Sequence, residues 1–183
     1  MLAGVSRRTL LAGLSCLLVG RAAGAHTPYK QWQVYRRRHL LIGTCRADPE
    51  SYPLGKRLAA ILASEVPESE AKVTRAPNQQ RLASLITTGQ LELVVLTFGE
   101  AVALASGNEP FAEFDPYPLR LVFQMDGYGL VCGKEFPARH AWLVTRALAQ
   151  RLPVSNGLAA PDDSGLAVHE GSRAFLAGAP QPD

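Results

Sequence analysis

The sequence predicts an α/β domain, in which a mostly parallel sheet has helices on both faces. The first observation is that short apolar runs of strand length alternate with segments whose apolar residues recur every three or four positions, as on one face of a helix. The second is the run at Leu91–Leu96, which is almost continuously apolar and so typical of a strand covered on both faces. With short right-handed crossovers, this alternation gives a parallel sheet between two layers of helices.

The first strand–helix unit begins at His39. An apolar run at His39–Thr44 predicts a strand, and a loop containing Asp48-Pro49 leads into a helix that begins near Ser51. Ser51 is a good N-cap residue for this helix. The apolar stripe of the helix consists of Leu54, Leu58, Ile61 and Leu62. The loop and the free N–H groups of the helix would form a polar, anion-tolerant cup at the carboxyl end of the strand.

The later elements continue the alternation and then depart from it. Asn78 would cap the second helix, and Gly89 is a natural residue to end it. Near the C-terminal end, Asp126-Gly127 between two apolar runs is a compact hairpin signal. The last long helix has Trp142, Leu143, Leu148 and Ala149 as its apolar candidates. The expected strands are Ala71–Arg75, Leu91–Leu96, Leu119–Met125 and Tyr128–Cys132, and the expected helices are Gln79–Thr88, Gly99–Ala105 and Ala138–Gln150.

Several stretches resemble one protein family. Gly43-Thr44, a six-residue gap and Ser51-Tyr52-Pro53-Leu54-Gly55 are similar to the first motif, roughly GTGGTGGTYYPLG, of the TAXI family, the extracytoplasmic solute-binding receptors of TRAP transporters. Leu82–Leu96 and Gly165–Ala177 resemble a second stretch and the closing motif of that family. The middle glycines of the first motif are replaced here by Cys45, Arg46, Ala47, Asp48 and Pro49.

The resemblance implies a single-lobe periplasmic-binding-protein-like domain at residues 39–177, with a tail at 178–183. A full receptor of this family has two lobes that close over the ligand. Val131–Leu148 resembles the stretch of the family that follows the return of the chain from the second lobe. Here the segments similar to the first lobe run into that stretch across the Asp126-Gly127 turn. We therefore expect the second lobe to be absent.

The N-terminal sequence predicts export. Ser6-Arg7-Arg8-Thr9-Leu10-Leu11 resembles a twin-arginine signal, and a short apolar stretch follows it. Ala23-Gly24-Ala25 then gives cleavage before His26, so that residues 1–25 are a signal peptide and 26–38 a polar lead-in segment. The expected location is the periplasm, and the alternative is an uncleaved N-terminal anchor.

Charge and motif content argue against several functions. Three of the 19 Lys and Arg residues lie within 1–25, and the remaining 16 balance 16 acidic residues, so a basic nucleic-acid-binding surface is not expected. The sequence has no nucleophile elbow, phosphate loop or dinucleotide-binding fingerprint, and its four histidines lack metal-ligand spacing. We therefore expect a protein that is not an enzyme, with no catalytic residues, metal or cofactor. Cys45 and Cys132 could pair or remain free thiols.

The predicted ligand site follows from the topology. In open parallel sheets, ligands bind beyond the carboxyl ends of the strands. The residues placed there are Thr44, Arg46, Ser51, Tyr52, Thr97 and Phe98. Arg46 could pair with the carboxylate of a small organic anion, whose charge the helix N-terminus would complement. Alternatively, Thr44 and Ser51 are turn and cap residues, Tyr52 belongs to the core, and Arg46 is a solvated loop arginine.

Two functions fit these features. The first is an exported solute-binding-protein-like subunit that binds a small organic solute weakly or as half of a cleft. The second is a non-catalytic interaction module that kept the fold, lost ligand capture, and docks on a TRAP-type membrane transporter or another periplasmic protein. The sequence leaves the oligomeric state open.

Overall fold

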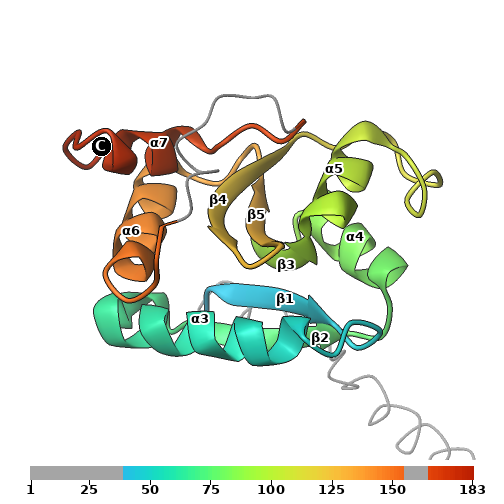
Figure 1. Ribbon diagram of the computed structural model, residues 1–183, viewed down its shortest axis with the longest axis horizontal. Coiled ribbons are helices and arrows are strands. Elements are labelled where there is room, and N and C mark those ends of the chain that lie inside the picture. The colour runs from blue at the N-terminus through green and yellow to red at the C-terminus, as the bar shows by residue number, and fades with distance from the viewer. Residues whose placement is uncertain (1–38, 155–164) are drawn as a thin grey trace, which may run out of the picture. The chain divides into compact units, whose positions relative to one another are not determined.

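One mixed sheet organises the described part of the chain, which comprises residues 39–154 and 165–183 of a computed structural model (Figure 1). Its strand order is β2-β1-β3-β5-β4. The strands are β1 (Leu41–Cys45), β2 (Lys72–Ala76), β3 (Leu93–Thr97), β4 (Leu119–Met125) and β5 (Tyr128–Gly133). The predicted signal peptide, its cleavage site and the lead-in segment lie outside the described residues.

The sheet has a parallel half and an antiparallel half. β1 pairs in parallel with both β2 and β3, as the strand–helix alternation predicts. β5 is antiparallel to β3 and to β4, and the predicted Asp126-Gly127 turn joins β4 to β5. Both turn residues have positive φ, 28° and 84°, which is the geometry that favours Asp-Gly in two-residue hairpins.

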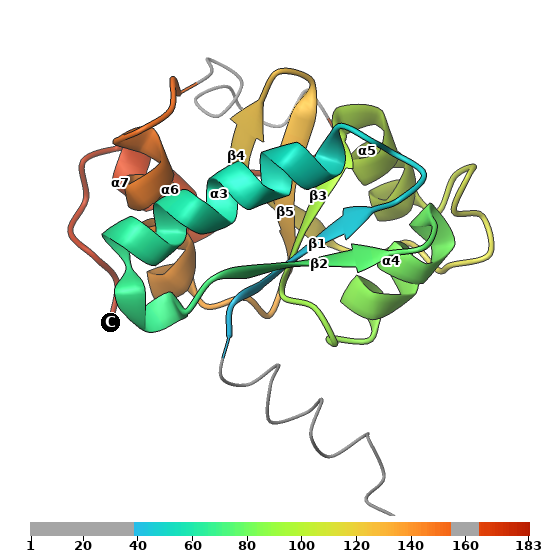
Figure 2. The same cartoon turned by 90° about the horizontal axis from the view of Figure 1, so that it is seen from below.

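Helices cover both faces of this sheet, which confirms the predicted α/β class. α3 (Ser51–Glu65), α6 (Ala138–Ala149) and α7 (Glu170–Leu176) lie on one side of the strands. α4 (Gln79–Thr87) and α5 (Phe98–Ser106) lie on the other (Figure 2). A short 3-10 helix, η2 (Pro67–Ser69), follows α3. The central strand β3 is buried along Leu93–Leu96, as its continuous apolar character predicts.

Most predicted helix ends and stripes are present, with two corrections. The side chain of Asn78 caps α4 by accepting the N–H of Arg81 at 2.8 Å, and Leu58 and Leu62 of α3 are fully buried. Ser51, however, is not the N-cap of α3: Glu50 holds that position, and the Ser51 hydroxyl bonds elsewhere.

The second correction concerns α6. Its buried residues are Ala141, Val144, Thr145, Ala147 and Leu148, so only Leu148 of the four apolar candidates is buried. The stripe includes the short side chains of Ala141, Thr145 and Ala147, because α7 packs closely against α6: a Cβ on Gly171 would lie 2.0 Å from the Ala138 carbonyl oxygen. The helices can approach only where side chains are short.

Cys45 and Cys132 are both free and buried. β3 separates their strands, and Cys132 lies level with Ile42, three residues before Cys45. At strand spacings of ~4.8 Å and a rise of ~3.3 Å per residue, their Cα atoms are ~14 Å apart. This is about twice the distance that a disulfide can bridge.

Candidate functional site

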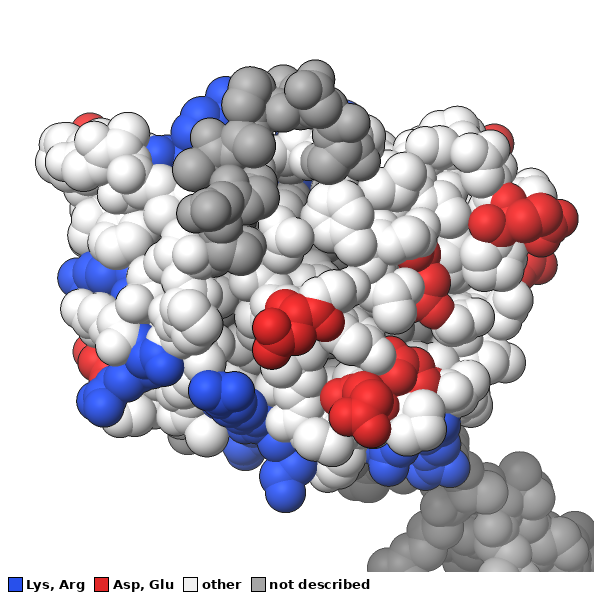
Figure 3. Space-filling view, in the orientation of Figure 1, with Lys and Arg blue, Asp and Glu red and all other residues white. Residues whose placement is uncertain are grey.

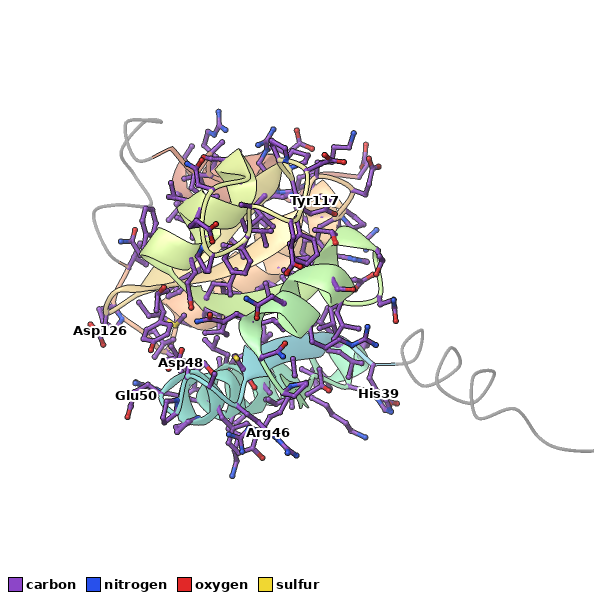
Figure 4. The ribbon with its side chains drawn as sticks, turned by 90° about the vertical axis from the view of Figure 1, so that its right-hand side faces the viewer. His39, Arg46, Asp48, Glu50, Tyr117 and Asp126 are labelled. Carbon is purple, nitrogen blue, oxygen red and sulfur yellow. The ribbon has the colours of Figure 1, made fainter. Side chains whose placement is uncertain are left out.

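The carboxyl ends of β1, β2 and β3 meet at one edge of the sheet, which we call the carboxyl edge. The β4–β5 hairpin turns at the same edge, because Tyr128 at the start of β5 pairs with Thr97 at the end of β3. The topology therefore brings together the loops in which the sequence places a ligand site. Figure 4 shows Asp48, Glu50 and Asp126 on this side of the molecule, with Arg46 nearby.

The turn between β1 and α3 is held from within by Ser51. Its buried hydroxyl lies 3.2 Å from the Cys45 amide nitrogen, 3.1 Å from the Cys45 carbonyl oxygen and 2.9 Å from the Asp48 carbonyl oxygen. A hydroxyl accepts one backbone N–H and donates to one carbonyl in this arrangement. Ser51 is thus committed to closing the turn, as the structural alternative for this residue predicts, although not as a cap.

Asp48 is the central acceptor of the carboxyl edge. One of its carboxylate oxygens accepts the backbone N–H of Glu50 at 3.1 Å and the hydroxyl of Tyr128 at 3.0 Å. Glu50 immediately precedes α3, so the carboxylate lies beside the partial positive charge of the helix N-terminus. A carboxylate that belongs to the chain therefore occupies the position where the anion-tolerant cup was predicted.

The pKa of Tyr128 reflects the negative charge of this edge. Burial, the hydrogen bond to Asp48, and the charges of Asp48, Glu100 and Glu50 together raise the pKa of Tyr128 to about 12. All of these charges are negative, so deprotonation would place another negative charge among them. Figure 3 shows, on the face drawn there, acidic side chains above a row of basic ones along the lower part of the molecule.

The two predicted threonines are also engaged with the backbone. Thr44 is fully buried and donates its hydroxyl to the Thr74 carbonyl of β2 at 3.0 Å. Thr97 caps α5 in a reciprocal capping box: its hydroxyl accepts the N–H of Glu100, and the Glu100 carboxylate accepts the N–H of Thr97. Glu100 also accepts a hydrogen bond from the side-chain amide of Gln79. These hydroxyls stabilise the fold.

Tyr52, Phe98 and Arg46 occupy three different environments. Tyr52 is half-buried, and its ring lies beneath the Arg75 guanidinium, whose carbon is 4.4 Å from the ring centroid. Phe98 is half-buried against the core and donates its backbone N–H to the Gly127 carbonyl of the hairpin at 2.9 Å. Arg46 is exposed, as expected of a solvated loop arginine.

A hollow of about 310 Å³ lies away from the carboxyl edge. It is lined by residues that include Ala105, Leu119, Arg120 and Leu166. Leu119 and Arg120 begin β4, and β4 runs in the same direction as β3, so the hollow lies at the amino end of these strands. The structure therefore separates it from all six predicted site residues.

Sequence reasoning missed Tyr128 and Glu100 as residues that organise this edge. Asp48 has a sequence signal, because it stands where the resembled motif has glycine, next to a proline. Tyr128 has none, because it comes from a hairpin 80 positions further along the chain. Within residues 39–154 and 165–183, no group of three or more metal-binding side chains is close enough to hold an ion. Nor does any helix there have the length and apolar character needed to span a membrane.

No protein-family model matches the chain, and no curated protein matches it.

Proposed function

We propose that the protein is an exported, non-catalytic relative of solute-binding receptors of the TAXI type. In this proposal its anion site is filled by its own Asp48, and it acts by binding another periplasmic protein or a TRAP-type membrane transporter. The observation that supports the loss of ligand capture is the Asp48 carboxylate, which accepts the Glu50 N–H and the Tyr128 hydroxyl beside the start of α3. A free carboxylate ligand would have to compete with a group that is already tethered.

The remaining donors of the predicted site support the same conclusion. The hydroxyls of Thr44, Ser51 and Thr97 are engaged with backbone groups of the fold. Recruiting any of them to a ligand would leave a buried backbone group unsatisfied, at a cost of about 1–3 kcal/mol. Glu50 and Glu100 add negative charge near the phenol of Tyr128, which opposes an incoming anion. Among the six, Arg46 carries the positive charge that favours one.

Ligand screening tests the loss of solute capture. Dicarboxylates and amino acids at about 100 times Kd would raise the free energy of unfolding by ~2.7 kcal/mol, which thermal unfolding readily detects. We expect that none of these compounds binds with a Kd near 0.1 mM or tighter, and that none therefore gives this stabilisation. A low-micromolar dicarboxylate whose binding is abolished in Arg46→Ala would instead establish a solute receptor.

Chemical rescue tests whether Asp48 acts as an internal ligand. Asp48→Ala vacates the donors of Glu50 and Tyr128, and acetate should then raise its melting temperature more than it raises that of the wild type. Glu50→Ala is the matched control, because it removes a neighbouring carboxylate that has no such pair of hydrogen bonds. Equal responses of Asp48→Ala and Glu50→Ala to acetate would refute internal occupancy.

The interaction half of the proposal needs a separate measurement. A photo-crosslinking amino acid placed at exposed positions of the carboxyl edge, such as Arg46 and Asp126, should give a discrete protein adduct in the periplasm of living cells. The same residue at exposed Arg139 on α6 serves as the control. If neither edge position gives an adduct that the control lacks, this edge is not the docking surface.

A further inference from the structure

The outer edge of β4 is covered by a C-terminal segment. We call residues 166–177 the clasp. The Leu121 N–H donates to the Ala167 carbonyl at 2.9 Å, and the His169 N–H donates to the Leu121 carbonyl at 2.8 Å. These bonds make a short parallel bridge between Leu121 and Val168. The clasp then continues as α7, which packs on α6.

His169 is the joint between the bridge and α7, and its ring has two fixed hydrogen-bonding roles. The side chain is almost fully buried. Its Nδ1 accepts the N–H of Gly171 at 3.1 Å and so caps α7. Its Nε2 lies 2.9 Å from the Phe136 carbonyl oxygen, which can only accept a hydrogen bond. Both contacts are satisfied only when the ring is neutral and its proton is on Nε2.

We propose that the clasp is acid-sensitive: protonation of His169 releases it from the edge of β4 while the rest of the sheet stays folded. A proton on Nδ1 would point at the Gly171 N–H, so the cap of α7 becomes a contact between two donors. The positive charge would also be buried. Release of the clasp removes both the contact between two donors and the buried charge, because water hydrates an exposed imidazolium.

Burial of the ring, rather than the balance of the charges around it, favours the neutral form. Arg120 on β4 and Arg173 on α7 oppose a positive ring, whereas Glu170 and the Phe136 carbonyl favour it. His140 on α6 packs edge-on against Phe136, with ring centroids 5.9 Å apart, and the exposed Lys134–Glu135 pair precedes Phe136. Burial is the largest influence, and the pKa of His169 is lowered from its usual 6.5.

The direction of the pH effect follows from this shift. In the closed clasp the pKa of His169 is below 6.5, and in the released clasp it returns to that value. The stabilisation of the closed form is therefore complete above pH 6.5 and is lost as the pH falls through the lowered pKa. Between these two pKa values, the equilibrium constant for opening of the clasp rises about tenfold for each unit by which the pH falls.

Release is local because the clasp is held mainly by two neighbours, β4 and α6. The central strand β3 is paired with β1 and β5 and does not contact the bridge through its hydrogen bonds. Opening of the clasp and unfolding of β3 are thus separable events with different free energies.

Amide hydrogen exchange between pH 7 and 4.5 tests the proposal, after correction for the pH dependence of intrinsic exchange. Protection at Leu121, His169 and Gly171 should fall by up to tenfold per pH unit below pH 6.5, while protection at Val94 and Val95 of β3 changes less. His169→Asn retains an acceptor for the Gly171 N–H and does not titrate, so its protection at these sites should be independent of pH. His140→Gln, which removes an exposed histidine, should behave as the wild type does.

A second measurement serves if His169→Asn folds poorly. In the wild type, the imidazole nitrogen resonances of His169 should titrate with the same midpoint as the loss of protection at Leu121. Equal loss at β3 and at the clasp would overturn the proposal in favour of global acid unfolding. Clasp protection that does not change with pH would overturn it as well.

Discussion

At the residue scale, Asp48 decides the character of the carboxyl edge. Its carboxylate joins the loop after β1 to the first residue of β5 through the Tyr128 hydroxyl, at 3.0 Å. The same oxygen accepts the N–H that precedes α3. Asp48 therefore couples a local turn to a hairpin distant in sequence, and it does so with a charge that the helix N-terminus stabilises.

Neutralising Asp48 should lower the pKa of Tyr128. In Asp48→Asn we expect the pKa to fall below about 12 but to stay above 10, because burial remains the largest cause of the increase. Titration of labelled tyrosine followed by NMR gives this value directly. Glu109→Gln, an exposed acid on the loop after α5, should leave the pKa of Tyr128 unchanged. An unchanged value in Asp48→Asn would show that the hydrogen bond does not form in solution.

The raised pKa of Tyr128 also has a consequence for stability. The folded protein holds the phenol proton more tightly than the unfolded chain, whose tyrosines ionise near pH 10. The phenol therefore contributes its full stabilisation below pH 10 and loses it between about 10 and 12.

At the scale of elements, the contact between α6 and α7 depends on Gly171. The residue is buried at the point where α7 meets the backbone of α6. On one side of this contact, Thr145 of α6 and Ser172 of α7 place their hydroxyl oxygens 2.8 Å apart. On another, Trp142 packs edge-on against Phe175 with ring centroids 5.4 Å apart. The close approach at Gly171, the buried hydroxyl pair and the aromatic pair thus all stabilise the contact between α6 and α7.

Gly171→Ala should therefore destabilise the protein strongly. The added Cβ would lie 2.0 Å from the Ala138 carbonyl oxygen, a backbone atom that cannot move without shifting α6. Overpacking of this kind costs about 1–3 kcal/mol or more of unfolding free energy, measurable by urea denaturation. Gly99→Ala in α5 is the control, because a Cβ there meets nothing within 4 Å. Equal stability of the two variants would show that α7 does not pack as described.

For single helices, the sequence patterns predicted some buried stripes and caps correctly and others wrongly. The stripe of α3 and the cap of α4 were predictable because large apolar residues and a short polar side chain each act within one helix. The stripe of α6 was not, because Ala141 and Thr145 are buried for their small size beside α7. A single helix carries no signal of how closely another will approach it.

At the scale of the whole molecule, the fold was largely predictable and the site only partly. Alternating strands and helices fix which loops share an edge of the sheet, so the carboxyl edge could be anticipated. The hydrogen bond between Tyr128 and Asp48 could not be anticipated, because it depends on the register of β5 against β3. Likewise, the role of Ser51 depends on a turn geometry that the residue type alone does not reveal.

The described residues should unfold as one cooperative unit. Residues 39–154 and 165–183 share a continuous core that spans both faces of β3. At neutral pH we expect far-ultraviolet circular dichroism and the near-ultraviolet signal of the aromatic residues to give the same midpoint in urea. A separate early transition in the aromatic signal alone would indicate that the Trp142–Phe175 region unfolds independently. A variant with Phe175→Leu identifies the contribution of that pair.

The bridge between Leu121 and Val168 has a consequence for the newly made chain. All five strands are synthesised before the residues that cover the edge of β4 leave the ribosome. For that interval the sheet has an unpaired strand edge, and such edges readily add a strand from another molecule. The growing polypeptide therefore passes through a stage in which self-association through β4 competes with the pairing of Leu121 and Val168.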